Sequence, residues 1–236
     1  MFGDIKKKDL KTQYIINLFN EIEKQSQNIN DLLKCAEDAF KTSFDETQKN
    51  NILLKLKESQ INDTTINQMV ITLFGLFKMV GLQLRFCASA NRIALYQVLI
   101  AKWIFKVIKK IQSYQKLIDE DTKQKLQSML KIAVEINQKS VDQLRVFCLS
   151  ELDSVSIDKE AVNLDSQIDT MYKQIKREMK SRIKSTNPKG IVGCYAILEI
   201  AKVIERISDY SIYNHFAIGY IATGKNISID VDGKEG

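Results

Sequence analysis

The sequence from Leu198 to Tyr210 reads LEIAKVIERISDY and decides how the rest of the chain is interpreted. Its apolar residues recur every three or four positions, which predicts the middle of a long amphipathic helix. Glu205 and Asp209 lie four residues apart, so the helix stacks their carboxylates on one face. That face borders the apolar side of the helix, where two carboxylates need a basic residue, water or a cation as partner.

The composition of the 236-residue chain favours an all-α protein with a sizeable hydrophobic core. Pro188 is the only proline and glycines are few, whereas a sheet protein of this size usually needs more of both in its turns. The net charge of +6 is mildly basic, and aromatic residues are not interleaved with the basic runs. We therefore expect no nucleic-acid partner.

Apolar periodicity and turn signals predict six long helices. Ser43 and Glu46 fit a capping box at the start of the second helix. Residues 185–190, which read STNPKG, are the clearest turn in the sequence and separate the last two helices. The expected helices cover residues 9–42, 46–79, 82–118, 121–152, 157–184 and 191–222.

Six helices suggest two sets of three, and a short internal match supports this division. Residues 62–69 (NDTTINQM) align with residues 164–171 (LDSQIDTM) at a constant offset, since 165 − 63 = 102 and 171 − 69 = 102. The match falls on the second helix of each set. We expect one three-helix unit over residues 1–118, a second over residues 119–224, and a polar tail over residues 225–236.

The string from Ile204 to Asp209 (IERISD) resembles the Glu-Arg-Ile-x-Asp signature of the PhoU family, which regulates phosphate uptake in bacteria and archaea. In that family the signature lies on the last helix of a three-helix unit. The resemblance implies two three-helix bundles side by side, related by a pseudo-twofold axis. In the first half, the positions of the family's two carboxylates fall at about Val98 and Lys102, so we expect any site there to be lost.

A second acidic pair, Asp165 and Asp169, lies at the edge of the apolar side of the fifth helix. If the fifth and sixth helices are antiparallel neighbours, this pair can converge with Glu205 and Asp209. Four carboxylates and almost no histidine suit cations that prefer oxygen ligands. The resemblance points the same way, because PhoU-like proteins bind metal clusters through acidic helix motifs. It implies at most one centre of iron, zinc or manganese, in the second half of the chain.

Other interpretations of these carboxylates stay open. An acidic pair on a helix is usually just solvated, and Lys202 lies one turn before Glu205 and can pair with it. Catalysis finds little support, because His215 is the only histidine and the chain has no phosphate-binding glycine loop or nucleophile motif. The four cysteines are widely spaced, which is typical of buried, reduced thiols.

The resemblance implies a regulator and not an enzyme, acting by contact with a phosphate transporter component or a phosphate-sensing kinase. The first residues do not read as a signal peptide and no apolar run is long enough to span a bilayer, so we expect a cytoplasmic protein. Peripheral membrane association and a homodimer stay open. The alternative is a metal-free helical adaptor or structural protein whose basic faces bind an acidic partner or a membrane surface.

Overall fold

The computed structural model describes residues 10–149 and 159–225, and within these ranges the regular structure consists of helices with no strand. This confirms the all-α class. The helices are α1 (Leu10–Ala39), α2 (Glu46–Leu76), α3 (Gly81–Tyr114), α4 (Glu120–Leu149), α5 (Lys159–Ile183) and α6 (Pro188–Thr223), with a short 3₁₀ turn, η1 (Gln115–Leu117), after α3.

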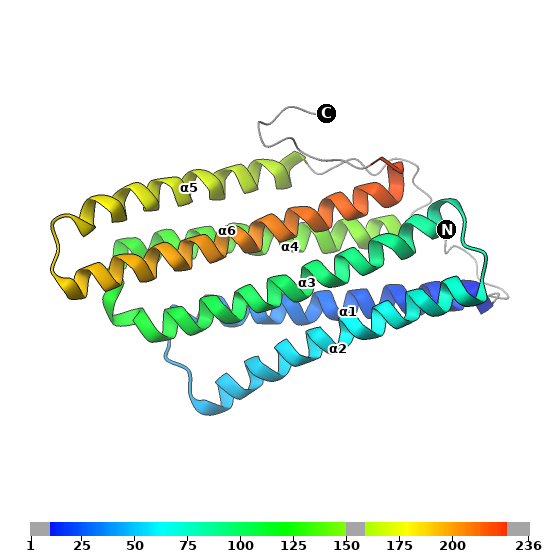
Figure 1. Ribbon diagram of the computed structural model, residues 1–236, viewed down its shortest axis with the longest axis horizontal. Helices are drawn as coiled ribbons and strands as arrows, with labels where there is room; N and C mark the ends of the chain where they lie inside the picture. The colour runs from blue at the N-terminus through cyan, green and yellow to red at the C-terminus, as the bar shows by residue number, and fades with distance from the viewer. Residues whose placement is uncertain (1–9, 150–158, 226–236) are drawn as a thin grey trace.

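The helices form one elongated bundle in which α6 and α3 are central (Figure 1). Helix α6 packs against α3, α4 and α5, and α3 packs against α1, α2 and α6. Half of α6 is buried, whereas α2 contacts only α1 and α3 to a substantial extent and lies at the edge of the bundle. The helix that carries Glu205 and Asp209 is thus held by three neighbours.

The apolar core continues through both sets of three helices. Its larger part takes buried side chains from all six helices, among them Ile29, Ile104, Leu130, Ile168 and Ile204. The expected boundary at residue 118 falls in the connection between α3 and α4, and the division into two separate units stays a prediction. No helix in the described part of the chain is long and apolar enough to cross a membrane.

The helix ends follow local capping chemistry, which corrects one expected capping box and one expected helix start. The capping box of α2 is formed by Asp45 and Gln48, not by Ser43 and Glu46: Asp45 accepts from the Gln48 N–H at 2.7 Å, and Gln48 accepts from the Asp45 N–H at 2.9 Å.

Helix α6 begins at Pro188 and not at Ile191. Asn187 accepts a hydrogen bond from the Gly190 N–H at 2.9 Å, and the fixed φ of Pro188 suits the first helical position. The expected start of the fifth helix, the end of the fourth and nearly all of the polar tail lie outside the described residues.

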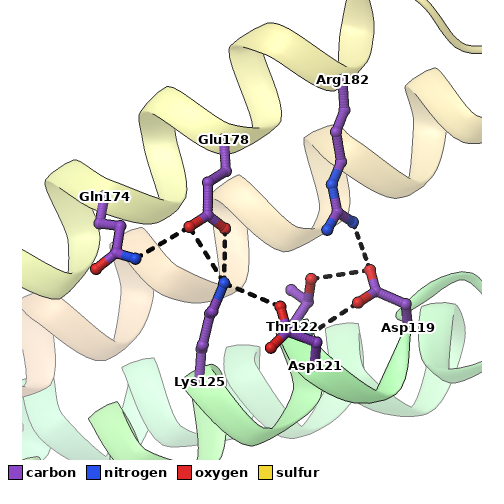
Figure 2. Close-up of polar contacts among 7 residues, drawn as sticks. All are labelled: Asp119, Asp121, Thr122, Lys125, Gln174, Glu178 and Arg182. Carbon is purple, nitrogen blue, oxygen red and sulfur yellow. Dashed lines mark hydrogen bonds and ion pairs between the residues drawn. The ribbon is translucent and has the colours of Figure 1, made fainter.

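A polar network joins the start of α4 to the end of α5 (Figure 2). Asp119 caps α4 by accepting from the Thr122 N–H at 3.0 Å and the Thr122 hydroxyl at 2.8 Å. Arg182 donates to the same carboxylate at 2.5 Å. One turn away, Lys125 pairs with Glu178 at 2.9 Å. These contacts hold α5 against α4 at the end of the bundle where α4 begins and α5 ends.

We expect acid to weaken this network as the Asp119 carboxylate becomes protonated. The hydrogen bonds from Thr122 and Arg182 outweigh burial and lower the pKa of Asp119 to about 2. A lowered folded-state pKa adds stability that is present above the unfolded pKa of about 4 and is lost as the pH falls toward 2. Because 44% of the Asp119 side chain is exposed, water screens the ion pair, and the gain is about 1 kcal/mol.

The variant Asp119→Asn keeps a capping oxygen but loses the charge, so its unfolding free energy should fall by about 1 kcal/mol at pH 7 and become equal to wild type near pH 2. Chemical denaturation at several pH values measures this difference. Asp38→Asn, in an exposed pair with Lys41, is the control and should change little. A difference in unfolding free energy between variant and wild type that is the same at all pH values would contradict the assignment of this stabilisation to the Asp119 carboxylate.

Candidate metal centre

The structure brings the two predicted acidic pairs to one place between α5 and α6. These helices pack side by side, with Asp165 and Asp169 on α5 and Glu205 and Asp209 on α6 (Figure 1). Ser208 links the two helices, because its hydroxyl is buried and donates to Asp165 Oδ1 at 2.5 Å. The predicted proximity of the pairs therefore holds, whereas their role as metal ligands stays a prediction.

The Glu205 side chain is largely enclosed, with 12% of it exposed. Lys202 Nζ lies 2.5 Å and 2.6 Å from its two carboxylate oxygens, which is the pairing expected from the sequence. The same ammonium group lies 5.1 Å from the centre of the Tyr172 ring on α5. Lys202 thus supplies a positive charge at one edge of the cluster, held by contacts to both helices.

Burial and mutual repulsion disfavour the ionised state of two of the carboxyl groups. Burial raises the pKa of Asp165, with further increases from Asp169 and Glu205, against a decrease from the Ser208 hydrogen bond. Burial, followed by the charges of Glu205 and Asp165, raises the pKa of Asp209 to about 7. Lys202 lowers the pKa of Asp209 but does not offset these effects. The cluster therefore concentrates more negative charge than its own lysine balances.

Three tyrosines that sequence reasoning did not single out lie beside the cluster. Tyr96 of α3 packs against Tyr210 and Tyr213 of α6, with ring centres 6.1 Å and 5.6 Å away. Burial and then the charge of Asp209 raise the pKa of Tyr213. Tyr213 follows Asp209 by one helical turn, which is the sequence signal for this contact, whereas the α3–α6 packing that adds Tyr96 has no local signal.

The side chains of the cluster suit a cation by their chemical type. They are carboxylates and a serine hydroxyl, which are oxygen donors of the kind that hard or borderline metal ions prefer. Within the described ranges, however, no three His, Cys, Asp or Glu side chains are placed to hold one metal ion together. A bound cation would compete with Lys202 for Glu205.

The first half of the chain places different groups at the related position. Asn67 donates to the backbone carbonyl of Asp63 at 2.9 Å and to its carboxylate at 3.3 Å. Burial raises the pKa of Asp63, while the charge of Lys102 on α3 lowers it. Lys102 occupies one of the two positions at which the resemblance in sequence would place a carboxylate. In this half of the chain, a lysine therefore lies near Asp63.

His215 lies apart from the carboxylates and contacts α4. It is fully buried, with Nδ1 2.6 Å from Gln143 Oε1 and Nε2 3.1 Å from the Ile136 carbonyl. These contacts explain why a histidine occupies the apolar interior: both ring nitrogens have polar neighbours. Of the cysteines, Cys87 and Cys194 are buried and Cys35 is half-buried, all as free thiols, and the side chain of Cys148 is outside the described set.

Comparison with known proteins connects this arrangement to a family. Residues 126–213, which span most of α4, all of α5 and most of α6, match the family model of the PhoU domain. No protein with curated annotation matches the chain.

Solved structures show the same fold. The phosphate transport system regulatory protein PhoU from Streptococcus pneumoniae has a TM-score of 0.72 at 17% identity, with 92% of this chain and 99% of that chain covered. PhoU from Pseudomonas aeruginosa has a TM-score of 0.62 at 15% identity, covering 91% and 96%.

A putative PhoU-like phosphate regulatory protein from Shewanella oneidensis has a TM-score of 0.52 at 12% identity, covering 82% and 96%. At such low identities, these similarities concern the fold alone. Residues 126–213 therefore match the PhoU domain family, and the fold of the described chain is that of the PhoU structures.

Proposed function

We propose that this protein regulates phosphate uptake or phosphate signalling in the cytoplasm, by contact with a phosphate transporter component or a phosphate-sensing kinase. The observation that carries the proposal is the PhoU domain match over residues 126–213, which includes both acidic pairs. The similarity in fold to a phosphate transport regulatory protein over 92% of the chain supports it. Catalysis has no part in this proposal.

The regulator's contact is tested by affinity capture from its own host. The full chain, tagged at one end and then at the other, is expected to retain a phosphate transporter subunit or the sensor kinase from membranes of cells grown with phosphate. A phosphate-independent metabolic protein of equal size serves as bait control. Capture of neither class by either tagged form, with folded bait, would overturn the proposal.

We also propose a carboxylate-bound metal centre, of iron, zinc or manganese, between α5 and α6. Glu205 and Asp209 would be its principal ligands, with Asp165 next and Asp169 at the edge. The metal would place a positive charge among the half-buried carboxylates and would hold α5 to α6. Ser208 keeps Asp165 turned toward α6, and burial by the neighbouring helices limits competition from water.

Lys202 should limit the affinity of this centre. The substitution Lys202→Met removes a competing cation and frees Glu205, while the methionine retains the apolar stem against Tyr172. Metal affinity, measured by competition with a chelator, is expected to rise about tenfold, equivalent to about 1.4 kcal/mol. Lys176→Met, a lysine that also stacks on Tyr172 but forms no ion pair with the cluster, is the matched control. Weaker binding by Lys202→Met would show that the lysine helps to build the site.

A homodimer is a further part of the proposal, and the outer side of α2 is the surface that favours it. This edge helix exposes several large apolar side chains, namely Leu53, Leu54, Ile61, Ile71, Phe74 and Leu76. Exposed apolar stripes of this kind commonly mark contact surfaces.

The double variant Ile61→Glu/Ile71→Glu places charges at 63% and 69% exposed positions, so folding should be unaffected. Sedimentation velocity over a range of concentrations is expected to show a dimer for wild type and a monomer for the variant. Gln60→Glu/Gln68→Glu, at two exposed positions on the same helix, controls for the same added negative charge. A wild-type monomer at all concentrations would contradict dimerisation.

The second candidate function is a metal-free adaptor that shares the fold. The specific observation in its favour is the Lys202–Glu205 ion pair, which gives the cluster a built-in cation. In that case metal loading would leave the thermal stability of the protein unchanged, and partner capture would be insensitive to chelators. A metal-dependent rise in melting temperature would exclude this candidate.

A further inference from the structure

A line of cations crosses the surface of three adjacent helices beside the carboxylate cluster. On α5, Lys176 Nζ lies 5.7 Å from the Tyr172 ring centre, and Lys202 of α6 contacts the same ring. One turn along α6, Arg206 lies 5.6 Å from the ring centre of Trp103 on α3. Lys106 lies 5.0 Å from that indole ring. We call these four cations and two rings the cationic belt.

The rings hold the cations in place but do not neutralise them. A cation over an aromatic face gains about 0.5–1 kcal/mol at an exposed site and keeps its full charge. The result is a row of positive groups whose positions are partly fixed before any ligand arrives. Such preorganisation lowers the entropy cost of binding.

Three cations of the belt lack an acidic partner. Lys106, Arg206 and Lys176 are exposed, and none forms an ion pair with a carboxylate in the described parts of the chain. The Trp103 indole N–H, next to two of them, also has no acceptor there although it is buried. By contrast, Lys110, one turn beyond Lys106, pairs with Glu199. The belt thus brings together three cations that have no carboxylate to neutralise them and one indole N–H that has no hydrogen-bond acceptor.

We propose that the cationic belt is the docking surface for an acidic protein segment, in which several Asp or Glu side chains span α5, α6 and α3. This rests on the proposed function, since the segment would belong to the regulator's partner. Charge complementarity carries the assignment: successive carboxylates would meet Lys176, Arg206 and Lys106, and one of them would supply an acceptor beside Trp103.

The geometry disfavours two other polyanions. Each ring already has two cations within 6 Å of its centre, and these compete with nucleic-acid bases for the ring faces. An anionic bilayer would bring its headgroups close to the half-buried carboxylates of Glu205 and Asp209 as well as to the belt. A narrow acidic segment can follow the row of cations and avoid that repulsion.

The test uses the single tryptophan of the chain, because Trp103 lies in the belt. A fluorescein-labelled 12-residue peptide of alternating Glu and Gly is titrated with the full-length protein, and anisotropy gives the affinity. The unlabelled peptide is then used to follow Trp103 emission. We expect saturable binding that changes Trp103 emission, and at least a tenfold weaker affinity for Lys106→Gln/Arg206→Gln.

Lys34→Gln/Lys57→Gln is the matched control, because it removes two exposed lysines on α1 and α2 and the same net charge. It should bind as wild type does. Equal losses in both variants, or binding without a change in Trp103 emission, would overturn the belt assignment. Binding to phosphatidylserine vesicles without binding to the peptide would also overturn the assignment, because it would identify the belt as a membrane-binding surface.

Failure of this inference differs from failure of the proposed function. If the Lys106→Gln/Arg206→Gln variant captures the transporter component or kinase as well as wild type does, the regulator proposal stands and the belt is not its docking surface. If wild type captures neither class but binds the peptide through the belt, the surface is real and the phosphate assignment is wrong.

Discussion

The double variant Glu205→Gln/Asp209→Asn is expected to lose bound metal entirely, while wild-type protein purified without an affinity tag carries about one metal centre. Both side chains keep their shape but lose the charge that attracts a cation, and amide oxygens are weaker ligands than carboxylates. We expect the affinity for iron, zinc or manganese to fall by at least 100-fold, which is about 2.7 kcal/mol. Elemental analysis of matched preparations measures the loss.

The same variant should remain folded, which separates loss of a site from loss of structure. Burial and the neighbouring carboxylates raise the pKa of Asp209 to about 7, so ionising this group costs stability as the pH rises from about 4 to about 7. An amide at this position removes that cost. In metal-free buffer at pH 8, the variant should therefore melt at a higher temperature than wild type.

Glu37→Gln/Asp38→Asn on α1 is the matched control, since it removes two acids distant from α5 and α6. It should retain the metal content of wild type. Metal at full occupancy in the Glu205→Gln/Asp209→Asn variant would assign the ion to another place. No metal in any preparation, even after anaerobic loading with ferrous iron, would remove the metal centre from the account.

Ile204→Ala is expected to cause a large loss of stability. Ile204 is fully buried in the core cluster that draws on all six helices. Truncation of a fully buried isoleucine loses its transfer free energy and leaves a cavity, which together cost about 3 kcal/mol. For a chain of this size, that corresponds to a melting temperature about 10 °C lower.

Urea denaturation followed by circular dichroism measures this loss. Ile61→Ala, at a 63% exposed position on α2, is the control and should change the unfolding free energy by less than about 0.5 kcal/mol. A loss below about 1 kcal/mol for Ile204→Ala would mean that α6 is not packed at the centre of the bundle as described.

Periodicity was sufficient to predict the six helices, because each long helix repeats its apolar residues over many turns. Helix ends were predicted less well, since they depend on single capping contacts. Asp45 and Ser43 are both acceptable caps from sequence, and only the backbone path selects Asp45 with Gln48. At α6 the sequence signal was present in Asn187 and Pro188, and the helix begins there and not three residues later.

The candidate site was predictable where it depends on one helix. The four-residue spacing of Glu205 and Asp209 and the nearness of Lys202 follow from helical geometry alone. Contacts between helices carried no such signal: Ser208 with Asp165, Tyr172 with Lys202, and Trp103 with Arg206 all depend on how α5, α6 and α3 pack. The sequence alone therefore did not indicate that the cations of the belt share one surface.

The most direct test of the central claim is the rate of radiolabelled phosphate uptake in the host organism with the coding sequence deleted. The account predicts that deletion changes uptake or its repression at high external phosphate, and that the wild-type chain restores the original behaviour in trans. Restoration should be incomplete with Glu205→Gln/Asp209→Asn produced at the same level. Unchanged uptake and unchanged phosphate repression in the deletion strain would contradict a regulatory role in phosphate transport.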